Sequence, residues 1–563
     1  MMDIFERKEI EEIPLSTPRF RRKVESFLQS NGLRLEDVDV YLGVLGEDGE
    51  ILAGGGIRRD IIKCIAVDEK VRSEGLAAPV VSRLISVGAA NGYDELRVFT
   101  KVENAPVFES LGFHIIARAP KAVLMENGRG LERYKEYLRG FACEGSAVIV
   151  MNADPFTLGH EYLVRQAAER CEKLFVIPVS EDQGRFPSGE RLGMIRACAG
   201  EYATVLNGSS YCISAATFPT YFLKDLSDAA ETQMRLDLDL FANHIAPSLG
   251  ATVRFVGSEP FDPLTERYNA MMKEVLPEVC VIPRLCDSQG PVSASRVRLS
   301  LDKGRYQEAA ALTPSSVHPA LLAELMGRAL RMELEERLKP GLVTPDGKGS
   351  HQDMDYHMMS GSIDVMRRSF VSRFSLAEND DIISFGKAVE KDVLDFTGGV
   401  NTHRGAIFCL GLAALATLRT SGGEERLREE ISSLASRVTG TADSHGGRAV
   451  RQYGVKGALD MALDGYAELF DDWLPFYRNV RCGEYALPRT LLRIMSTLDD
   501  TCVIHRAGID SARLVKEEAA ALLEDFSAAG MAEMNARFVE EGISPGGAAD
   551  MLTLTIFIDS IIN

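Results

Sequence analysis

The chain has 563 residues, of which 45% are hydrophobic and 26% are charged, and its formal net charge at pH 7 is −19. This length is too great for one hydrophobic core and predicts about three or four domains, while the composition excludes a disordered chain. The negative charge argues against non-specific binding to nucleic acid or to an anionic membrane surface, because both need a basic face.

The sequence predicts neither a membrane span nor a signal peptide. No apolar stretch reaches transmembrane length, and acidic residues stand near the start of the chain, where a signal peptide would be apolar. The ten cysteines are scattered and contain no Cys-x-x-Cys pair, which indicates reduced thiols and neither a disulfide framework nor a zinc site. We therefore expect a cytoplasmic protein that binds neither nucleic acid nor membrane.

Residues 1–140 are predicted to form an α+β domain. The apolar segments 38–45 and 51–55 flank the turn Glu47-Asp48-Gly49, which is a hairpin signal, and the segment 61–67 indicates a third strand.

A glycine-containing loop follows this third strand. It contains Arg72, Gly75 and Ala77 and leads into an amphipathic helix that extends to residue 90. Backbone N–H groups at a helix start can bind a pyrophosphate, and the loop resembles the acyl-CoA-binding Arg/Gln-x-x-Gly-x-Gly/Ala element of the GNAT-type acetyltransferases. The later segment 104–113, N-A-P-V-F-E-S-L-G-F, is similar to the end of that family's fold. The resemblance implies a GNAT-type domain whose loop binds a cofactor; the alternative is an ordinary helix start and stop beside a small sheet.

Residues 141–325 alternate between strand and helix patterns, which is typical of a parallel sheet. The predicted strands lie at Ala147 and at residues 174–179, 253–256 and 279–282, with helices between them. This pattern predicts an α/β, Rossmann-like domain.

A phosphate-binding motif follows the first of these strands. The run M-N-A-D-P-F-T-L-G-H joins the strand to a helix. Such a helix start offers free N–H groups and the positive end of a dipole to an anion, and an imidazole in the first turn can add a hydrogen bond. We predict that Thr157 and His160 are catalytic and that Asn152 and Gly159 bind the nucleotide. Ordinary helix-start chemistry is the alternative, and Asn152 and Asp154 suit a structural turn equally well.

A second element lies about 130 residues further along, a spacing that suits a doubly wound nucleotide-binding domain. The segment 291–298, P-V-S-A-S-R-V-R, places two hydroxyls and two guanidiniums ahead of another helix. The Thr-x-Gly-His run is a variant of the His-x-Gly-His signature of the nucleotidyltransferase superfamily, and this segment resembles the element that closes over the triphosphate there. The resemblance implies that Ser293 and Ser295 bind phosphates and that Arg296 is catalytic. A serine N-cap before a solvated basic turn is the alternative.

Two further segments are similar to one family, citrate lyase ligase. They are residues 213–224, I-S-A-A-T-F-P-T-Y-F-L-K, and residues 254–261, R-F-V-G-S-E-P-F. The resemblance covers residues 1 to about 320 and includes the order of the two predicted domains. It implies that ATP activates acetate to acetyl-adenylate, with AMP and pyrophosphate as products, and that the acetyl group passes to a thiol on the acyl carrier (gamma) subunit of citrate lyase. Gly257 and Glu259 would line the adenosine side, and Mg²⁺ is expected wherever a triphosphate is aligned.

Residues 326–563 are predicted to be all helical, because long helical patterns replace the strand signals. A helix over residues 310–338 would bridge the boundary, and further helices are predicted at residues 381–395, 404–418, 424–438 and 511–529.

Five polar clusters interrupt these helical patterns. They contain Lys339; His351, Asp353 and Asp355; Asn401, Thr402, His403 and Arg404; Asp499, Asp500 and His505; and Gly546, Gly547 and Asp550. Paired carboxylates such as Asp353 and Asp355 suit Mg²⁺-triphosphate, although two charges at a helix start are an equally good interpretation. The run from Asn401 that opens a helix is an anion-site pattern.

The clusters resemble triphosphoribosyl-dephospho-CoA synthase across nearly the whole of residues 326–563. That family joins ATP to dephospho-CoA through the ribose and expels adenine, making the precursor of the citrate lyase prosthetic group. Displacement at an anomeric carbon is assisted by nearby carboxylates and by a proton donor to the leaving base. The resemblance implies that Asp353, Asp355 and His403 are catalytic, with the two aspartates holding Mg²⁺. It also implies a set of substrate-binding residues: Lys339, His351, Asn401, Thr402, Arg404, Asp499, Asp500 and His505.

One departure from that family concerns the segment 457–461. The family has Gly-Ala-Arg-Gly-Glu there, whereas this chain has Leu459 and Met461 in place of the arginine and the glutamate.

We therefore expect a bifunctional citrate lyase maturation enzyme whose substrates are acetate, ATP and dephospho-CoA. The alternative is a pantetheine-phosphate-type adenylyltransferase fused to a non-catalytic helical domain that binds a partner.

Overall fold

The computed structural model describes residues 9–180, 184–212, 226–258, 263–378, 381–420, 423–438 and 445–563. The chain divides into two compact units, Met1–Val292 and Ser293–Asn563, and each is described by itself. The segment 213–224 and Glu259, which entered the sequence prediction, lie outside the described residues.

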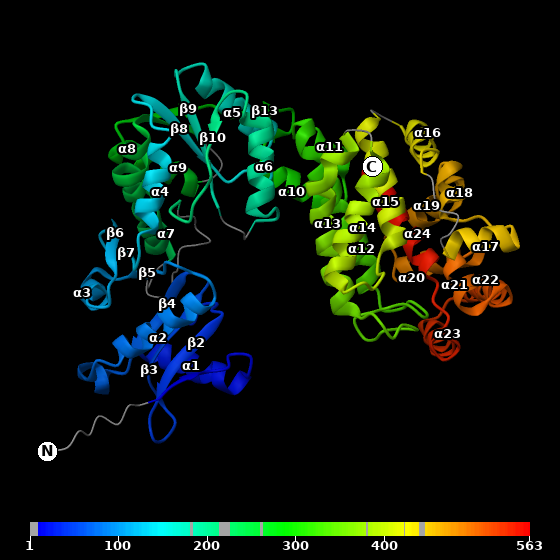
Figure 1. Ribbon diagram of the computed structural model, residues 1–563, viewed down its shortest axis with the longest axis horizontal. Helices are drawn as coiled ribbons and strands as arrows, with labels where there is room; N and C mark the ends of the chain where they lie inside the picture. Colours follow the sequence, from blue (N-terminus) through cyan, green and yellow to red (C-terminus); the bar gives the residue numbers. More distant parts are fainter. Residues whose placement is uncertain are drawn as a thin grey trace. The chain divides into compact units, whose positions relative to one another are not determined.

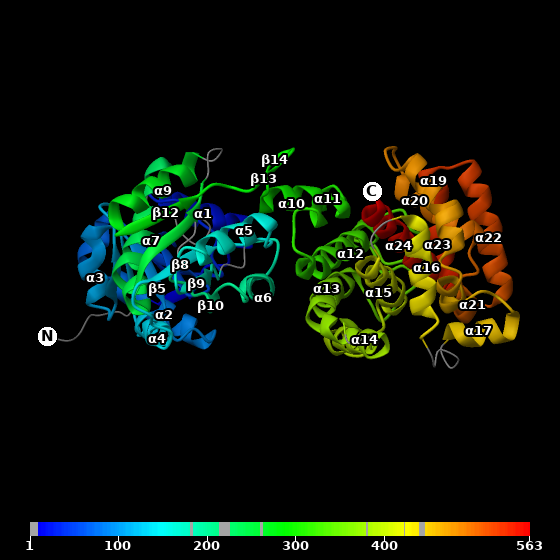
Figure 2. The same cartoon turned by 90° about the horizontal axis from the view of Figure 1, so that it is seen from above.

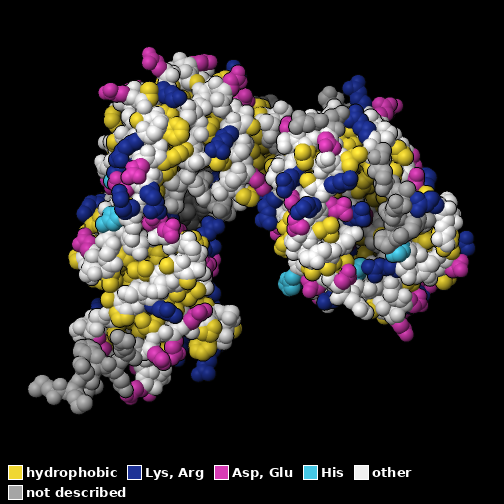
Figure 3. Space-filling model, in the orientation of Figure 1, with side chains coloured by type: hydrophobic (Ala, Val, Ile, Leu, Met, Phe, Trp, Pro, Cys, Tyr) yellow, Lys and Arg dark blue, Asp and Glu magenta, His cyan; other side chains and the backbone are white. Residues whose placement is uncertain are grey.

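Among the described helices, none is long and apolar enough to span a membrane. Acidic and basic side chains alternate over the face shown in Figure 3.

The first unit begins with a seven-stranded mixed sheet (Figure 1). Its strands, in sheet order, are β1 (Ile10–Glu12), β2 (Val40–Leu45), β3 (Ile51–Arg58), β4 (Ile61–Val67), β5 (Arg97–Thr100), β7 (Val123–Glu126) and β6 (His114–Arg118). Neighbouring strands are antiparallel except β4 and β5, which run parallel. The predicted hairpin and third strand are confirmed by β2, β3 and β4.

Several helices belong to the same part of the chain as this sheet. They include α1 (Pro18–Ser30), the short 3-10 helix η1 (Glu69–Glu74), α2 (Ala77–Ala90), α3 (Ala105–Glu109) and α4 (Gly130–Arg139). The predicted helix that ends at residue 90 is confirmed by α2. Its apolar face buries Val80, Val81 and Leu84 against the sheet.

A five-stranded parallel sheet follows. Its strands, in sheet order, are β10 (Thr204–Val205), β9 (Leu174–Pro178), β8 (Ser146–Met151), β11 (Ala251–Gly257) and β12 (Glu278–Ile282). The four predicted strands are confirmed. Strand β10 was missed because a strand of two residues is too short to show an apolar or alternating run. The strand order reverses between β8 and β11, and in open parallel sheets ligands bind at the carboxyl ends of the strands at that point.

The helices of this second sheet are α5 (Leu158–Ala168), α6 (Ser188–Ala199), α7 (Leu226–Leu240), the π-helix η3 (Phe241–Ile245), α8 (Ala246–Leu249) and α9 (Pro263–Val275). A small hairpin, β13 (Cys286–Asp287) and β14 (Gly290–Pro291), ends the unit.

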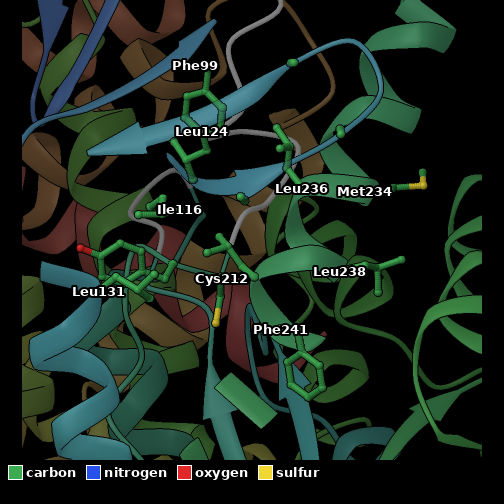
Figure 4. Packing of buried hydrophobic residues seen from close by; sticks show 14 of the residues in the cluster. Phe99, Ile116, Leu124, Leu131, Cys212, Met234, Leu236, Leu238 and Phe241 are labelled. Carbon is green, nitrogen blue, oxygen red and sulfur yellow. The ribbon is translucent and has the colours of Figure 1, made fainter. Parts of the chain in front are cut away.

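The two sheets share one hydrophobic core. Figure 4 shows Phe99 and Leu124 of the first sheet in the same cluster as Leu131 of α4 and Leu236 of α7. Hydrogen bonds reinforce the packing: the hydroxyl of Tyr211, beyond β10, donates to the buried Glu126 of β7 at 2.6 Å. The mixed sheet and the parallel sheet therefore form one compact unit.

The second unit is helical (Figure 2). Its α-helices are α10 (Ala294–Asp302), α11 (Tyr306–Ala310), α12 (His318–Glu335), α13 (Tyr356–Glu378), α14 (Ile382–Thr397), α15 (Arg404–Arg419), α16 (Glu424–Ala435), α17 (His445–Tyr453), α18 (Ala458–Leu463), α19 (Leu474–Val480), α20 (Ala486–Thr497), α21 (Thr501–Ala507), α22 (Ile509–Glu524), α23 (Ala528–Glu541) and α24 (Gly546–Ile562). Helix α24 is buried along most of its length and packs against α12, α15 and α20.

Two helix predictions in this unit are right in type but wrong in their bounds. The helix expected over residues 310–338 is interrupted at Pro314, which cannot donate a backbone hydrogen bond, and α12 begins only at His318. The helix expected over residues 511–529 ends at Glu524, and α23 begins after Ser527, whose side chain caps it. The predicted helices at residues 381–395, 404–418 and 424–438 are confirmed by α14, α15 and α16.

Candidate active sites

The first candidate site lies where β8 leads into α5. Thr157 is the N-cap of α5, and its buried hydroxyl accepts the backbone N–H of His160 at 3.4 Å. In return, the backbone N–H of Thr157 donates to Nδ1 of His160 at 3.0 Å. The two residues therefore cap the helix reciprocally, and the imidazole is fixed at the helix start.

This network also fixes the proton on His160. A backbone N–H can only donate, so Nδ1 is the acceptor and the proton of the neutral ring is on Nε2. Desolvation, together with the nearby charge of Arg284, lowers the pKa of His160 to about 4. At neutral pH His160 is therefore an uncharged hydrogen-bond donor.

Gly159 permits a close backbone contact. A Cβ at this position would lie 2.6 Å from the carbonyl oxygen of Val292, the residue directly before Ser293. The small hairpin of β13 and β14 thus ends against the start of α5.

The three residues predicted to close over the triphosphate belong to the second unit. Ser293 is the N-cap of α10 and accepts the backbone N–H of Arg296 at 3.3 Å. The hydroxyl of Ser295 accepts from the guanidinium of Arg298 at 3.2 Å.

The turn after β8 is held by side chains that sequence reasoning missed. The fully buried Arg191 of α6 donates to the carbonyl oxygen of Asn152 at 2.9 Å and also contacts its side-chain oxygen. The carboxylate of Asp154 accepts the backbone N–H groups of Arg185 and Phe186 at 3.1 and 2.9 Å. Asp154 therefore has a structural role. No sequence signal marked Arg191, because its partner lies 39 residues away.

Two other predicted groups lie at open positions of the first unit. Gly257 ends β11, and among the described residues no atom lies within 4 Å of a Cβ built there. In the loop before Ala77, the first residue of α2, Arg72 is 59% exposed beside Glu69, and Gly75 has a φ of +70°.

The second candidate site is a cavity of about 1170 Å³ inside the helical unit. Nine of the residues predicted from separate clusters line it: His351, Asp353, Asn401, Thr402, His403, Arg404, Asp499, Asp500 and His505. Residues from α12, α15 and α24 also line the cavity, so segments far apart in the sequence meet there.

Two predicted residues are not part of the cavity lining. Lys339 is buried and forms an ion pair with Glu333 at 2.7 Å, and it is Glu333 that reaches the cavity. Asp355 accepts the backbone N–H of Met358 at 2.9 Å at the start of α13, and this hydrogen bond lowers the pKa of its carboxyl.

His403 is buried at the start of α15 with its Nδ1 2.8 Å from the hydroxyl oxygen of Ser362. The carbonyl of Met359 lies 2.9 Å from that hydroxyl, and we assign the hydroxyl proton to it, so that the oxygen of Ser362 accepts from Nδ1–H. The remaining nitrogen, Nε2, then carries a lone pair. Burial, together with the charge of Lys339, lowers the pKa of His403 to about 4. His403 is therefore a neutral proton acceptor at neutral pH.

His351 is held from two sides. Its Nε2 lies 2.8 Å from the hydroxyl of Ser544, and its Nδ1 lies 3.3 Å from a guanidinium nitrogen of Arg506. Since a guanidinium can only donate, Nε2–H of His351 donates to Ser544. Burial lowers the pKa of His351, and Arg506 lowers it further. Asp353 is 3.9 Å away and reaches solvent.

Sequence reasoning missed part of the charge in this cavity. Lys387, Arg451 and Arg506 line it, as does Glu333. The two departures from the family pattern, Leu459 and Met461, line it too. Within the described ranges, no group of three or more histidine, cysteine, aspartate or glutamate residues is arranged to hold a metal ion.

The first site is a helix start in an α/β unit, of the kind that binds a nucleotide phosphate. The second is a cavity in a helical unit, lined by polar and apolar side chains. Residues 146–320 match the family described as citrate lyase ligase C-terminal domain, and residues 319–563 match the family described as ATP:dephospho-CoA triphosphoribosyl transferase.

Individual relatives divide in the same way. The citrate (pro-3S)-lyase ligase of Escherichia coli K12 is 39% identical over 329 residues, which cover 56% of this chain and 92% of that protein. The ligase of Klebsiella pneumoniae is 40% identical, covering 54% and 92%. A probable 2-(5''-triphosphoribosyl)-3'-dephosphocoenzyme-A synthase of Stutzerimonas stutzeri A1501 is 35% identical over 264 residues, covering 43% of this chain and 91% of that protein. The chain belongs to both families, the citrate lyase ligases and the triphosphoribosyl-dephospho-CoA synthases, and is a fusion of the two.

Proposed function

We propose that this chain is a bifunctional enzyme of citrate lyase maturation. Its ligase half forms acetyl-adenylate and pyrophosphate from acetate and ATP, then passes the acetyl group to the thiol prosthetic group of the acyl carrier subunit and releases AMP. Its transferase half joins ATP to dephospho-CoA through the ribose and releases adenine. The observation that carries the proposal is the convergence of nine separately predicted residues on one cavity, beside the family membership of both halves.

In the ligase half, His160 would donate a hydrogen bond from Nε2 to the phosphates of ATP. Attack of a carboxylate on the α-phosphorus depends on alignment and charge stabilisation, and the free N–H groups at the start of α5 add to both. Thr157 would act through His160, because its hydroxyl is buried against that ring. Asn152 and Gly159 form the turn and the close contact that shape this helix start.

Further residues of the ligase half would complete the ATP site. Ser293, Ser295 and Arg296 would hold the β- and γ-phosphates, as the family resemblance implies. Gly257 would line the adenosine side, together with Glu259.

Magnesium would neutralise part of the triphosphate charge. Mg²⁺ commonly binds one or two carboxylates together with substrate phosphates and water, so it needs no dedicated protein cage. In the transferase half, Asp353 at the cavity and Asp355 beside it would supply these carboxylates.

In the transferase half, His403 would accept the proton of the attacking hydroxyl of dephospho-CoA on Nε2. Its tautomer supports this role, and its lowered pKa keeps the ring unprotonated at neutral pH while making it a weaker base. The remaining predicted residues would bind the two substrates: His351, Asn401, Thr402, Arg404, Asp499, Asp500 and His505 from the cavity wall, with Lys339 behind Glu333.

We extend the proposal to the domain organisation: a GNAT-type domain over residues 1–140, a nucleotidyltransferase domain over residues 141–325 and a helical domain over residues 326–563. The antiparallel sheet with one parallel pair, β4 and β5, supports the first assignment. A cytoplasmic location belongs to the same proposal, since ten free cysteines suit a reducing compartment.

The loop before α2 would bind the phosphates of the carrier's CoA-like arm. It is exposed at Arg72, and Gly75 leaves its backbone open to a ligand. Gly75→Val should raise the Michaelis constant for the carrier protein and leave acetyl-adenylate formation intact. Unchanged carrier kinetics in a folded variant would reduce this loop to a structural role.

The alternative is a pantetheine-phosphate-type adenylyltransferase fused to a non-catalytic helical scaffold. Membership of both families disfavours it. One observation favours it: Leu459 and Met461, which stand where the family has an arginine and a glutamate, line the cavity. Nucleotide products decide between the two. ATP with acetate and deacetylated carrier should yield AMP and pyrophosphate, and ATP with dephospho-CoA should yield free adenine. Adenylation of pantetheine phosphate without adenine release would favour the alternative.

A further inference from the structure

Three carboxylates from three separate elements share the wall of the helical cavity. They are Glu333 of α12, Asp500 at the start of α21 and Asp550 of α24. Carboxylates placed near one another in a partly desolvated site cannot all ionise, and differences in their hydrogen-bond partners decide which one keeps its proton.

Two of the three have partners that stabilise a negative charge, although burial raises the pKa of Asp500. Glu333 pairs with the ammonium group of Lys339 at 2.7 Å. Asp500 accepts three backbone N–H groups, from Cys502 at 2.8 Å, Val503 at 3.3 Å and Ala548 at 2.9 Å.

Asp550 has much weaker support for a negative charge. The contact that stabilises its anion is the backbone N–H of Ala406 in the first turn of α15. Desolvation raises the pKa of Asp550 well above its ordinary value, and the charges of Asp500 and Glu333 raise it further. Ionised neighbours therefore favour the protonated, neutral form of Asp550.

The other titratable groups that face Asp550 do not change this conclusion. They are Cys409 of α15, Tyr466 after α18 and Cys502 of α21, and each has a pKa raised well above its ordinary value by burial. All three are uncharged at neutral pH. The cation Lys339 is already paired with Glu333.

The position of the acid is specified by the backbone. A Cβ at Gly405 would lie only 1.9 Å from a carboxylate oxygen of Asp550, so glycine makes room for that side chain. Gly405 and Ala406 stand in the first turn of α15, and His403 is the N-cap of the same helix. An acid and a proton acceptor therefore lie at one helix start in the cavity wall.

We propose that Asp550 is the general acid that protonates the departing adenine in the transferase reaction, an assignment that rests on the function proposed for the helical unit. As the bond between the anomeric carbon and N9 of adenine breaks, its electron pair passes into the base, and the proton of Asp550 passes to a ring nitrogen. A hydroxyl oxygen of dephospho-CoA bonds to the anomeric carbon, and its proton passes to Nε2 of His403. Solvent then returns a proton to Asp550 and removes one from His403, so no other reactant is needed.

The test compares ATP with ATP methylated at N7 of adenine, whose base already carries a positive charge and leaves without a proton. Asp550→Asn should release adenine from ATP about 10² to 10⁴ times more slowly than the unchanged protein, the usual range for a lost general acid. With the methylated nucleotide the variant and the unchanged protein should release the base at similar rates. The matched control is Asp510→Asn, since Asp510 has a side chain 90% exposed at the start of α22.

Several results would overturn the assignment. Equal losses with both nucleotides would make Asp550 structural, and full activity of Asp550→Asn with ATP would remove it from the reaction. If the unchanged protein releases no adenine from ATP and dephospho-CoA, the proposed function itself fails.

Two further measurements keep the assignment testable if Asp550→Asn does not fold. In the unchanged protein, turnover of ATP should fall as pH rises and Asp550 loses its proton, whereas turnover of the methylated nucleotide should not. Gly405→Ala should displace the carboxylate and show the same selective loss with ATP. Gly327→Ala on α12 is its control, because the nearest atom to a Cβ there is 3.5 Å away. The assignment would be overturned if turnover of both nucleotides fell in the same way as pH rose. It would also be overturned if Gly405→Ala lost equal activity with both nucleotides.

Discussion

The two halves of the chain place a neutral histidine at a helix start in opposite tautomers. In the ligase half, the backbone of Thr157 donates to Nδ1 of His160, which leaves a proton on Nε2. In the transferase half, Nδ1 of His403 donates to Ser362, which leaves a lone pair on Nε2. Both rings have a pKa near 4, so neither acts as a cation at neutral pH. The partner of Nδ1, and not the residue type, decides whether each ring donates or accepts.

Each tautomer suits the chemistry proposed for its half. A phosphate offers acceptor oxygens and calls for a donor, whereas an attacking hydroxyl must lose a proton and calls for an acceptor.

The largest effect is expected for His403→Gln. Loss of a general base typically slows a reaction by about 10² to 10⁴ fold, so adenine release should fall by that factor while acetate-dependent AMP formation continues. His357→Gln is the control, because His357 is exposed on α13. Adenine release at the full rate would show that Nε2 of His403 is not the proton acceptor.

His160→Ala is expected to slow acetate-dependent AMP formation by roughly two to three decades, the scale of about 3 to 4 kcal/mol for one donor that stabilises developing charge. Adenine release by the same protein should be unchanged and serves as the internal control. A variant that keeps its full ligase rate would make His160 structural and would break the comparison.

The lowered pKa values also predict how stability depends on pH. A histidine with a pKa of about 4 in the folded state and 6.5 in the unfolded state binds its proton more readily when unfolded. Its contribution to stability is complete above pH 6.5 and is lost as pH falls towards 4. For the buried His403 the full loss is on the order of 3 kcal/mol.

Urea unfolding at a series of pH values checks this linkage. The free energy of unfolding should decline between pH 6.5 and pH 4 in the unchanged protein, and the slope should be smaller in His403→Gln. The slope should also be smaller in His160→Ala, because the pKa of His160 is likewise lowered to about 4. Identical slopes in all three proteins would contradict the pKa assignment.

A smaller effect is expected for Ser362→Ala, which removes the acceptor of Nδ1–H in His403. The ring would lose one hydrogen bond that fixes its tautomer, so adenine release should fall about tenfold, or about 1.4 kcal/mol. Ser362→Thr, which keeps the hydroxyl, should restore most of the rate. If the threonine variant is as slow as the alanine variant, the loss reflects packing and not the tautomer.

The sequence predicted many of the residues that meet in the helical cavity, but not what each one does there. The clusters around His351, His403 and Asp500 were predicted to bind one pair of substrates, and the structure brings them to one cavity. The tautomer of His403 could not be predicted, because Ser362 lies 41 residues earlier on α13. Glu333 likewise carries no signal of its own in a helical pattern.

In the fold, likewise, regular elements were predictable from the sequence pattern, whereas very short elements and exact helix ends were not. The strands of the parallel sheet were predictable because each is a continuous apolar run between helices, whereas β10 has two residues and no such pattern. The break at Pro314 was missed because helical patterns continue on both sides of it. The capping role of Asp355 depends on where α13 begins, which a pair of carboxylates in the sequence does not reveal.

The smallest effect is expected for Thr157→Val. The hydroxyl of Thr157 caps α5, so its loss should lower stability by about 1 kcal/mol. The backbone N–H that fixes the tautomer of His160 remains in the variant. Acetate-dependent AMP formation should therefore stay within a few fold of the unchanged rate, in contrast to the loss expected for Ser362→Ala, where the side chain itself orients the ring. A ligase rate as low as that of His160→Ala, in a variant that still folds, would mean that the hydroxyl of Thr157 contacts the phosphates directly.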